Sequence, residues 1–228
     1  MTAADQRSGL LAIDTATSEV VVTTGDVDGS PSAVATWTAG HRQGETLLAG
    51  IERVLAEQDL PRSALVGIVV GTGPGAFTGL RVGMATAKGL AHGLAIPLVG
   101  VSTAEALIDA ATNDPTDRIV LLLPAGPRDR LVVRSGAAPV ALAAGSEPEV
   151  APGETLVAVD LDERAPGDAL ERGERARRGL GAAVLRAGAL RLAAVVSDEL
   201  ATLVPDYVTL PRGARPSQGT VQWSRDHR

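Results

Sequence analysis

The chain has 228 residues, a length that suits one large domain or two smaller lobes, and 45% of these residues are apolar. It contains no cysteine, which excludes disulfides, thiolate metal sites and a cysteine nucleophile. The net charge of −6 argues against strong independent binding to a nucleic acid, which usually needs a basic face. We expect a soluble, cytoplasmic protein without membrane contact, because the N-terminus lacks a signal-peptide pattern and no apolar run could span a bilayer.

The first part of the chain predicts three short strands and one helix. Apolar and β-branched runs indicate strands at 10–14, 20–24 and 33–38, joined by tight turns. Such an arrangement is typical of an antiparallel meander. Apolar residues at helical spacing then predict a helix over 45–58, which cannot continue past Pro61.

The middle of the chain alternates strands and helices. The expected elements are a strand at 65–70, a glycine-rich loop at 71–79, a helix at 80–93 and a strand at 97–101. A further helix begins at Ser102, because Glu105 stands three residues later and the pair forms a capping-box pattern.

The second half predicts a smaller strand and helix region. Its expected elements are strands at 119–123, 131–134 and 156–159, a loop at 141–153 and a helix at 180–195. We therefore divide the chain into an N-terminal lobe (1–110), a C-terminal lobe (111–205) and a flexible tail (206–228). The order of elements predicts an α/β fold with mixed sheets, flanking helices and two lobes, similar to the actin-like and ribonuclease-H-like (ASKHA) class.

The glycine-rich loop 71–79 allows three interpretations. A dinucleotide fingerprint fits weakly, because Ala76 occupies the third glycine position and no acidic residue ends the next strand. A Walker-type phosphate loop is excluded, because no Gly-Lys-Ser/Thr is present and Lys88 lies far along the helix. The residues themselves favour a structural role, in which the glycines and Pro74 shape a tight turn before the helix.

Two segments carry a resemblance to a known family. Residues 73–83, with the sequence GPGAFTGLRVG, closely resemble the signature of the TsaB (YeaZ) family. Residues 11–17, LAIDTAT, resemble the first strand and turn of that family. His41, followed by Glu45 and the pair at 47–48, resembles the start of its first helix. The resemblance is specific over about residues 10–105.

The resemblance implies a non-catalytic subunit that supports the threonylcarbamoyladenosine (t6A) modification of tRNA. Such a subunit pairs with a larger catalytic paralogue, TsaD, and works with a small ATPase, TsaE. It reaches tRNA only through this complex and forms a homodimer when alone. It brings no cofactor of its own, although ATP or ADP can lie at the junction with the catalytic subunit.

The same resemblance implies the residues of the partner face. The implied contacts come from the first two helices: Leu47, Leu48, Ile51, Val54, Leu55, Phe77, Leu80, Arg81, Met84 and Lys88. The residues implied to lie near a nucleotide are Asp14, Gly73, Gly75 and Thr78. The sequence leaves a second interpretation open, in which the apolar helix stripes pack on the chain's own sheet.

The sequence predicts no catalytic or metal site. His41 and Glu45 have helical spacing, but one pair without further ligands makes a poor metal site. Where the family carries an Asp-Ala-Arg-Arg-Gly-Glu-Val-Tyr-like stretch, residues 123–131 read LPAGPRDRL, so Pro124 replaces the acid. Asp14 therefore lacks a second carboxylate for phosphoryl transfer, and we expect it to bind its own turn. The competing functions are an actin-like-fold ATPase or kinase and a glycoprotease-like metallopeptidase.

Overall fold

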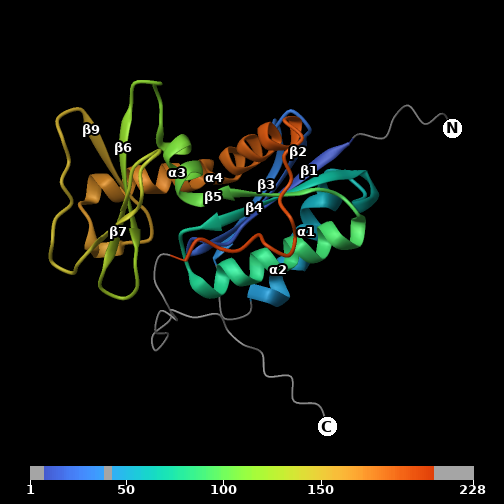
Figure 1. Ribbon diagram of the computed structural model, residues 1–228, viewed down its shortest axis with the longest axis horizontal. Coiled ribbons are helices and arrows are strands. Elements are labelled where there is room, and N and C mark those ends of the chain that lie inside the picture. The colour runs from blue at the N-terminus through green and yellow to red at the C-terminus, as the bar shows by residue number, and fades with distance from the viewer. Residues whose placement is uncertain (1–7, 39–42, 208–228) are drawn as a thin grey trace, which may run out of the picture.

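A computed structural model describes residues 8–38 and 43–207, and these form two sheets flanked by helices (Figure 1). The strands are β1 (Gly9–Asp14), β2 (Glu19–Asp26), β3 (Pro31–Thr38), β4 (Leu65–Gly73), β5 (Leu98–Ser102), β6 (Arg118–Pro124), β7 (Arg130–Val133), β8 (Val140–Leu142) and β9 (Glu154–Ala158). The helices are α1 (Gln43–Glu57), α2 (Phe77–Leu94), α3 (Thr103–Ala111) and α4 (Gly167–Ala193), with short 3₁₀ turns η1 (Arg62–Ala64) and η2 (Asp162–Arg164). None of these helices has the length and apolar character that crossing a membrane requires.

The first sheet has the strand order β3-β2-β1-β4-β5. The first three strands form the expected antiparallel meander, and β4 and β5 then run parallel to β1. All six residues of the central strand β1 are buried, because helices cover both faces of the sheet. This order is the mixed topology that the sequence predicted.

Two layers of helices enclose the first sheet. One face packs against α1 and α2, whose apolar stripes share a core with alternate residues of β1, β2 and β4. The other face packs against α3 and α4, which also contact the second sheet. The two sheets therefore share one hydrophobic core, with α3 and α4 between them.

The second sheet has the order β8-β7-β6-β9, in which only β9 runs parallel to β6. Helix α4 follows β9, and in Figure 1 it extends from this sheet back across the first sheet. It contacts β9 at one end and β1, β2, β4 and β5 further along. The division into lobes stays a prediction, but α4 comes from the second stretch of sequence and packs on the first sheet.

A polar clasp ties the β1–β2 turn to the loop after β9. The Asp160 carboxylate accepts hydrogen bonds from the backbone N–H (2.6 Å) and the hydroxyl (2.5 Å) of Ser18. The Arg177 guanidinium on α4 lies 3.6 Å from the same carboxylate and 3.5 Å from Glu19. Sequence reasoning did not find this clasp, because its members are far apart in the chain.

Several element boundaries differ from the sequence expectation, including a short strand, β8, where a loop was expected from residue 141. Strand β4 continues to Gly73 and α2 begins at Phe77, so the glycine-rich loop is much shorter than 71–79. Helix α4 begins at Gly167, well before residue 180. The buried positions in this additional stretch are the small residues Ala169, Gly173 and Ala176. A stripe of such small residues gives little hydrophobic signal in a sequence.

The expected cap of α3 is confirmed in part. The Ser102 hydroxyl accepts a hydrogen bond from the Glu105 backbone N–H at 3.3 Å. The Glu105 side chain does not complete the capping box. It accepts hydrogen bonds from the Ser135 hydroxyl and the Gly136 backbone N–H instead, and so joins α3 to the turn after β7.

Candidate functional site

The two family-like segments pack directly against each other at the carboxyl ends of β1 and β4. Gly71, two residues before the second segment, and two glycines within that segment meet three consecutive positions of the first segment. A Cβ atom at position 71 would overlap the Asp14 carboxylate, and one at position 75 would overlap the Ala16 carbonyl oxygen. A Cβ atom at Gly83 would overlap the Thr15 hydroxyl. Each of these glycines therefore allows a close approach that a larger residue would block.

Asp14 is at the centre of this junction and is 1% exposed. Its Oδ1 atom accepts a hydrogen bond from the Ala16 backbone N–H (2.9 Å), which confirms the expected turn. Its Oδ2 atom accepts a hydrogen bond from the Thr103 hydroxyl (2.6 Å), a partner that sequence reasoning missed. Both carboxylate oxygens are therefore engaged within the chain.

The environment of Asp14 disfavours its ionised form. Burial raises the pKa of the Asp14 carboxyl to about 6, and the negative charge of Asp160 adds to this effect. The hydrogen bonds from Thr103 and Ala16 act in the opposite direction and lower the pKa. Asp14 is thus a packed structural carboxyl in this chain.

The residues implied to lie near a nucleotide are not all accessible. Gly73 is buried at a φ of +100°, and its N–H donates a hydrogen bond to the Thr103 hydroxyl at 3.1 Å. The Ala76 N–H donates to the Ala16 carbonyl oxygen at 2.7 Å. Gly75 and Thr78 are exposed at the start of α2. A role for the set of four near a nucleotide stays a prediction.

The structure corrects the predicted partner face. Six of the ten implied residues lie in the chain's own core, where they cover the first sheet: Leu47, Ile51, Val54, Leu55, Leu80 and Met84. The expectation of an open apolar stripe is therefore wrong for these six, and their packing follows the second interpretation that the sequence allowed. Their helical spacing signalled burial, but it could not say against what.

Four of the implied residues remain accessible. Leu48 on α1 is 50% exposed, and on α2 Arg81 is exposed while Phe77 and Lys88 are half-buried. Helix α2 also presents small exposed residues at a spacing of four, Ala85, Gly89 and Gly93. Another backbone could approach this helix closely, because nothing described lies within 4 Å of a Cβ atom built at either glycine.

The segment after α4 reaches the start of α2. The Asp206 backbone N–H donates to the Thr72 carbonyl oxygen (2.8 Å), and the Thr72 hydroxyl donates to the Asp206 carboxylate (2.6 Å). The Tyr207 ring packs on Phe77 with 5.0 Å between ring centroids. Asp206 and Tyr207 fall in the stretch that the sequence assigned to a flexible tail (206–228). Residues 208–228 lie outside the described part of the chain.

Metal ligation finds little support in the described residues. Within 8–38 and 43–207, His, Asp and Glu side chains form no group of three that could hold a metal ion. His41 lies outside these ranges, so the pair that it forms with Glu45 in sequence cannot be placed.

The atypical segment at 123–131 forms a tight hairpin between β6 and β7. Pro124 pairs with Arg130, and the Ala125 N–H donates to the Asp129 carbonyl oxygen at 3.0 Å. The buried Arg130 guanidinium donates to the carbonyl oxygens of Arg164 and Ser146. The segment thus has a structural role in holding the second sheet to η2.

The strand order, the shared helical layer and the packed β1–β4 junction define a two-sheet α/β protein of the actin-like, ribonuclease-H-like class. The family model described as "TsaD: tRNA N6-adenosine threonylcarbamoyltransferase" matches residues 37–213. The chain is 34% identical over 214 residues to an uncharacterized protein of Mycobacterium tuberculosis, covering 90% of this chain and 94% of that protein. With the TsaB and YeaZ relatives described next, these matches place the chain in the TsaB (YeaZ) family.

Two further comparisons agree with this assignment. The chain is 36% identical over 95 residues to the "tRNA threonylcarbamoyladenosine biosynthesis protein TsaB" of Escherichia coli, covering 41% of this chain and 40% of that protein. The structure of YeaZ from Pseudomonas aeruginosa has the same fold, with a TM-score of 0.66, 22% identity and coverage of 88% of this chain and 100% of that chain. The chain spans only 30% and 20% of the length of two other curated relatives that it matches.

Proposed function

We propose that this chain is a non-catalytic subunit of the tRNA t6A machinery, and that it binds a larger catalytic paralogue through the outer face of α1 and α2. The observation that carries the proposal is the accessible surface left on these helices after their apolar stripes are buried. Leu48 is a large exposed apolar residue on α1, and α2 offers Phe77, Arg81 and Lys88 beside small residues. Such a mixture of apolar, aromatic and arginine side chains is typical of the energetic centre of an interface.

The state of Asp14 supports a non-catalytic role. A phosphotransferase of this fold class would need an accessible carboxylate to organise magnesium and nucleotide. Asp14 is enclosed by Gly71, Ala16 and Thr103, and its raised pKa reflects a buried group. The geometry therefore favours the binding subunit over the actin-like ATPase or kinase.

The remaining assignments follow from the family. The partners are the TsaD paralogue and the TsaE ATPase, with tRNA reached through the assembled complex and a homodimer formed in their absence. ATP or ADP would lie at the junction with the paralogue, where Gly75 and Thr78 are exposed beside the proposed face. The chain would act in the cytoplasm, where tRNA is modified.

Reconstitution tests the proposal. The chain, its TsaD and TsaE counterparts from the same organism, ATP, a preformed activated threonylcarbamoyl donor and unmodified tRNA are combined, and t6A is measured by mass spectrometry of the digested tRNA. We expect t6A only when this chain is present, and no ATP hydrolysis by the chain alone. Full t6A formation without the chain would refute the proposal, as would ATP hydrolysis by the chain alone that Asp14→Asn abolishes.

A further inference from the structure

The only phenylalanine and the only tyrosine of the chain meet at its surface. Aromatic residues make up 2% of the sequence, with one Phe, one Tyr and two Trp. Large aromatic side chains normally contribute most by being buried. Phe77 and Tyr207 instead stack on each other outside the core, although they are 130 residues apart in sequence, and Tyr207 is 39% exposed. The fold does not need these two rings for its own core.

Arg81 contacts both rings. Its guanidinium carbon lies 3.9 Å from the Phe77 ring centroid and 5.8 Å from that of Tyr207. Its Nε–H donates a hydrogen bond to the Tyr207 hydroxyl at 3.0 Å. No other described residue takes a hydrogen bond from its terminal nitrogens, so four N–H groups are held in a fixed plane and open to an incoming acceptor.

The segment that carries Tyr207 is anchored along its length. The Asp198 N–H donates to the Leu98 carbonyl oxygen (2.8 Å), and its carboxylate accepts from the Gly100 N–H (2.7 Å) and from Arg191 (3.0 Å). Leu203 packs against the core between α1, α2 and the first sheet. Asp206 is bound to Thr72 as described above. We call residues 198–207 the C-terminal strap, and in Figure 1 it crosses from the end of α4 towards the start of α2.

The charges on α2 and on the neighbouring residues of α1 indicate which kind of partner surface would bind there. Helix α2 carries Arg81, Lys88 and His92 and has no carboxylate over its 18 residues, although the chain as a whole has a net charge of −6. The nearby carboxylates Glu52 and Glu57 of α1 pair with Arg62 (3.0 Å) and Arg53 (3.7 Å), and Glu45 also has a partner.

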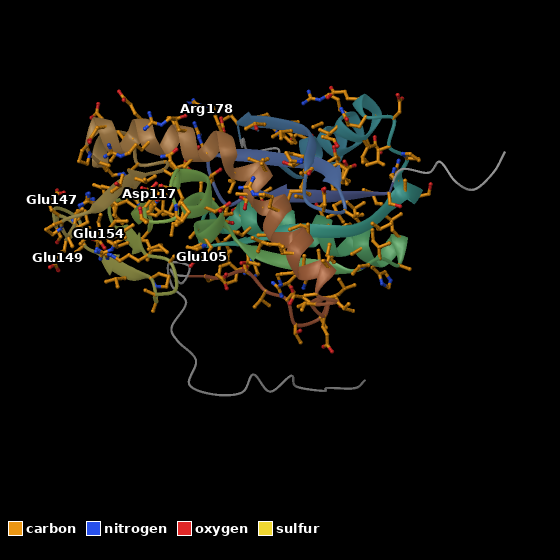
Figure 2. The ribbon with its side chains drawn as sticks, turned by 90° about the horizontal axis from the view of Figure 1, so that it is seen from above. Glu105, Asp117, Glu147, Glu149, Glu154 and Arg178 are labelled. Atoms are coloured by element: carbon orange, nitrogen blue, oxygen red, sulfur yellow. The ribbon has the colours of Figure 1, made fainter. Side chains whose placement is uncertain are left out.

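Three glutamates lie at the other end of the molecule, and Glu154 among them pairs with Arg134. Figure 2 shows Glu147, Glu149 and Glu154 together beside the second sheet. Helix α2 therefore presents a basic surface on an acidic protein, although the exposed Asp206 carboxylate lies beside its start, where it accepts a hydrogen bond from Thr72. Such a surface is complementary to an acidic one.

We propose that Phe77, Arg81 and Tyr207 form one composite hot spot, with the C-terminal strap as the third element of the partner face. The occupant is a protein partner whose docking surface is acidic and presents a carboxylate to the free edge of Arg81. Tyr207 acts as a positioning residue, because it fixes the plane of the guanidinium that makes a bidentate contact. The inference rests on the proposed function and adds the chemistry of the partner and an element outside the two helices.

The test measures the dissociation constant for the purified TsaD counterpart by calorimetry. We expect Tyr207→Ala to weaken binding by about 30-fold, as for an interface hot spot. Tyr207→Phe keeps the ring and loses one hydrogen bond, so a loss of about 3-fold to 10-fold follows. Arg81→Gln should weaken binding and also reduce its salt dependence, because the charge pair is removed. Val195→Ala, at a residue 93% exposed just before the strap, is the control and should bind like the wild type.

Three outcomes of these binding measurements would count against the proposals. Wild-type affinity in Tyr207→Ala, or tighter binding in it, would overturn the inference while leaving the proposed function intact. An unchanged salt dependence in Arg81→Gln would exclude an acidic partner surface. A wild-type chain that does not bind the counterpart at all would refute the proposed function, and this inference with it.

Discussion

Gly71 lies against Asp14 so closely that a Cβ atom at position 71 would overlap the Asp14 Oδ2 atom. This contact shows how the glycine-rich segment and the LAIDTAT segment fit together in the folded chain. Each segment is shaped to fit the other, and together they fix the direction in which α2 leaves the first sheet. The junction therefore places the proposed partner face.

The first prediction concerns this contact. Gly71→Ala should lower the free energy of unfolding by about 2 kcal/mol or more, because neither the buried carboxyl nor the Thr103 hydroxyl next to it can move away easily. Gly89→Ala is the matched control, since its Cβ atom would point into open space in an exposed part of α2. It should stabilise the protein by about 0.5 to 1 kcal/mol. Urea unfolding measures both, and equal effects would contradict the packing described.

The second prediction concerns pH. The pKa of Asp14 is raised from 3.8 to about 6 in the folded chain, so between these values the folded state holds a proton that the unfolded state has lost. The contribution of Asp14 to stability is therefore present below pH 4 and is lost as the pH rises towards 6.

Asp14→Asn removes this titration. The stability of the wild type relative to Asp14→Asn should fall between about pH 4 and 6, by up to about 1.4 kcal/mol per pH unit. Other carboxyls, such as Glu154, whose pKa is held at about 2 by Arg134, titrate in both proteins and cancel. Urea unfolding of both proteins across this range measures the difference. A constant difference would mean that Asp14 is not buried as described.

The third prediction concerns the clasp between the two parts of the fold. Asp160→Ala should lower the free energy of unfolding by about 1 to 2 kcal/mol, because two hydrogen bonds to Ser18 and the pairing with Arg177 are lost. Asp162→Ala is the control, because Asp160 and Asp162 both have a positive φ, but no side-chain hydrogen bond joins Asp162 to another described residue. Similar losses in both variants would show that backbone strain, and not the clasp, is responsible.

The fourth prediction separates core from surface on α1. Ile51→Arg should prevent folding, because an unpaired charge would be placed in the core between α1 and the first sheet. Leu48→Arg should fold like the wild type, because this side chain is half exposed. Circular dichroism and thermal unfolding compare the two variants. A folded Ile51→Arg protein would contradict the burial of the stripe.

Most of the fold could be predicted from the sequence, because its signals are local. The apolar and β-branched runs of β1 to β3, the capping serine of α3 and the proline after α1 each act within a few residues. The first half of α4 could not be predicted, because Ala169, Gly173 and Ala176 pack closely without being strongly hydrophobic. Its burial depends on which sheets it meets, which is a tertiary property.

The candidate site was predicted less well, for a related reason. Helical spacing identified the apolar stripe of α1, but burial against the chain's own sheet and burial against a partner give the same pattern. Tyr207 was missed because its contacts with Phe77 and Arg81 span more than 120 residues and its neighbours show no periodicity. The one available signal was that Tyr207 is the only tyrosine in a chain poor in aromatic residues.

The most direct test of the partner face is the affinity of the folded Leu48→Arg variant for the purified TsaD counterpart. Leu190→Arg is the matched control, because Leu190 is 73% exposed on α4, outside the proposed face. We expect Leu48→Arg to weaken binding by about 30-fold or more and Leu190→Arg to bind like the wild type. Wild-type affinity in a folded Leu48→Arg protein would show that the outer face of α1 is not part of the partner interface.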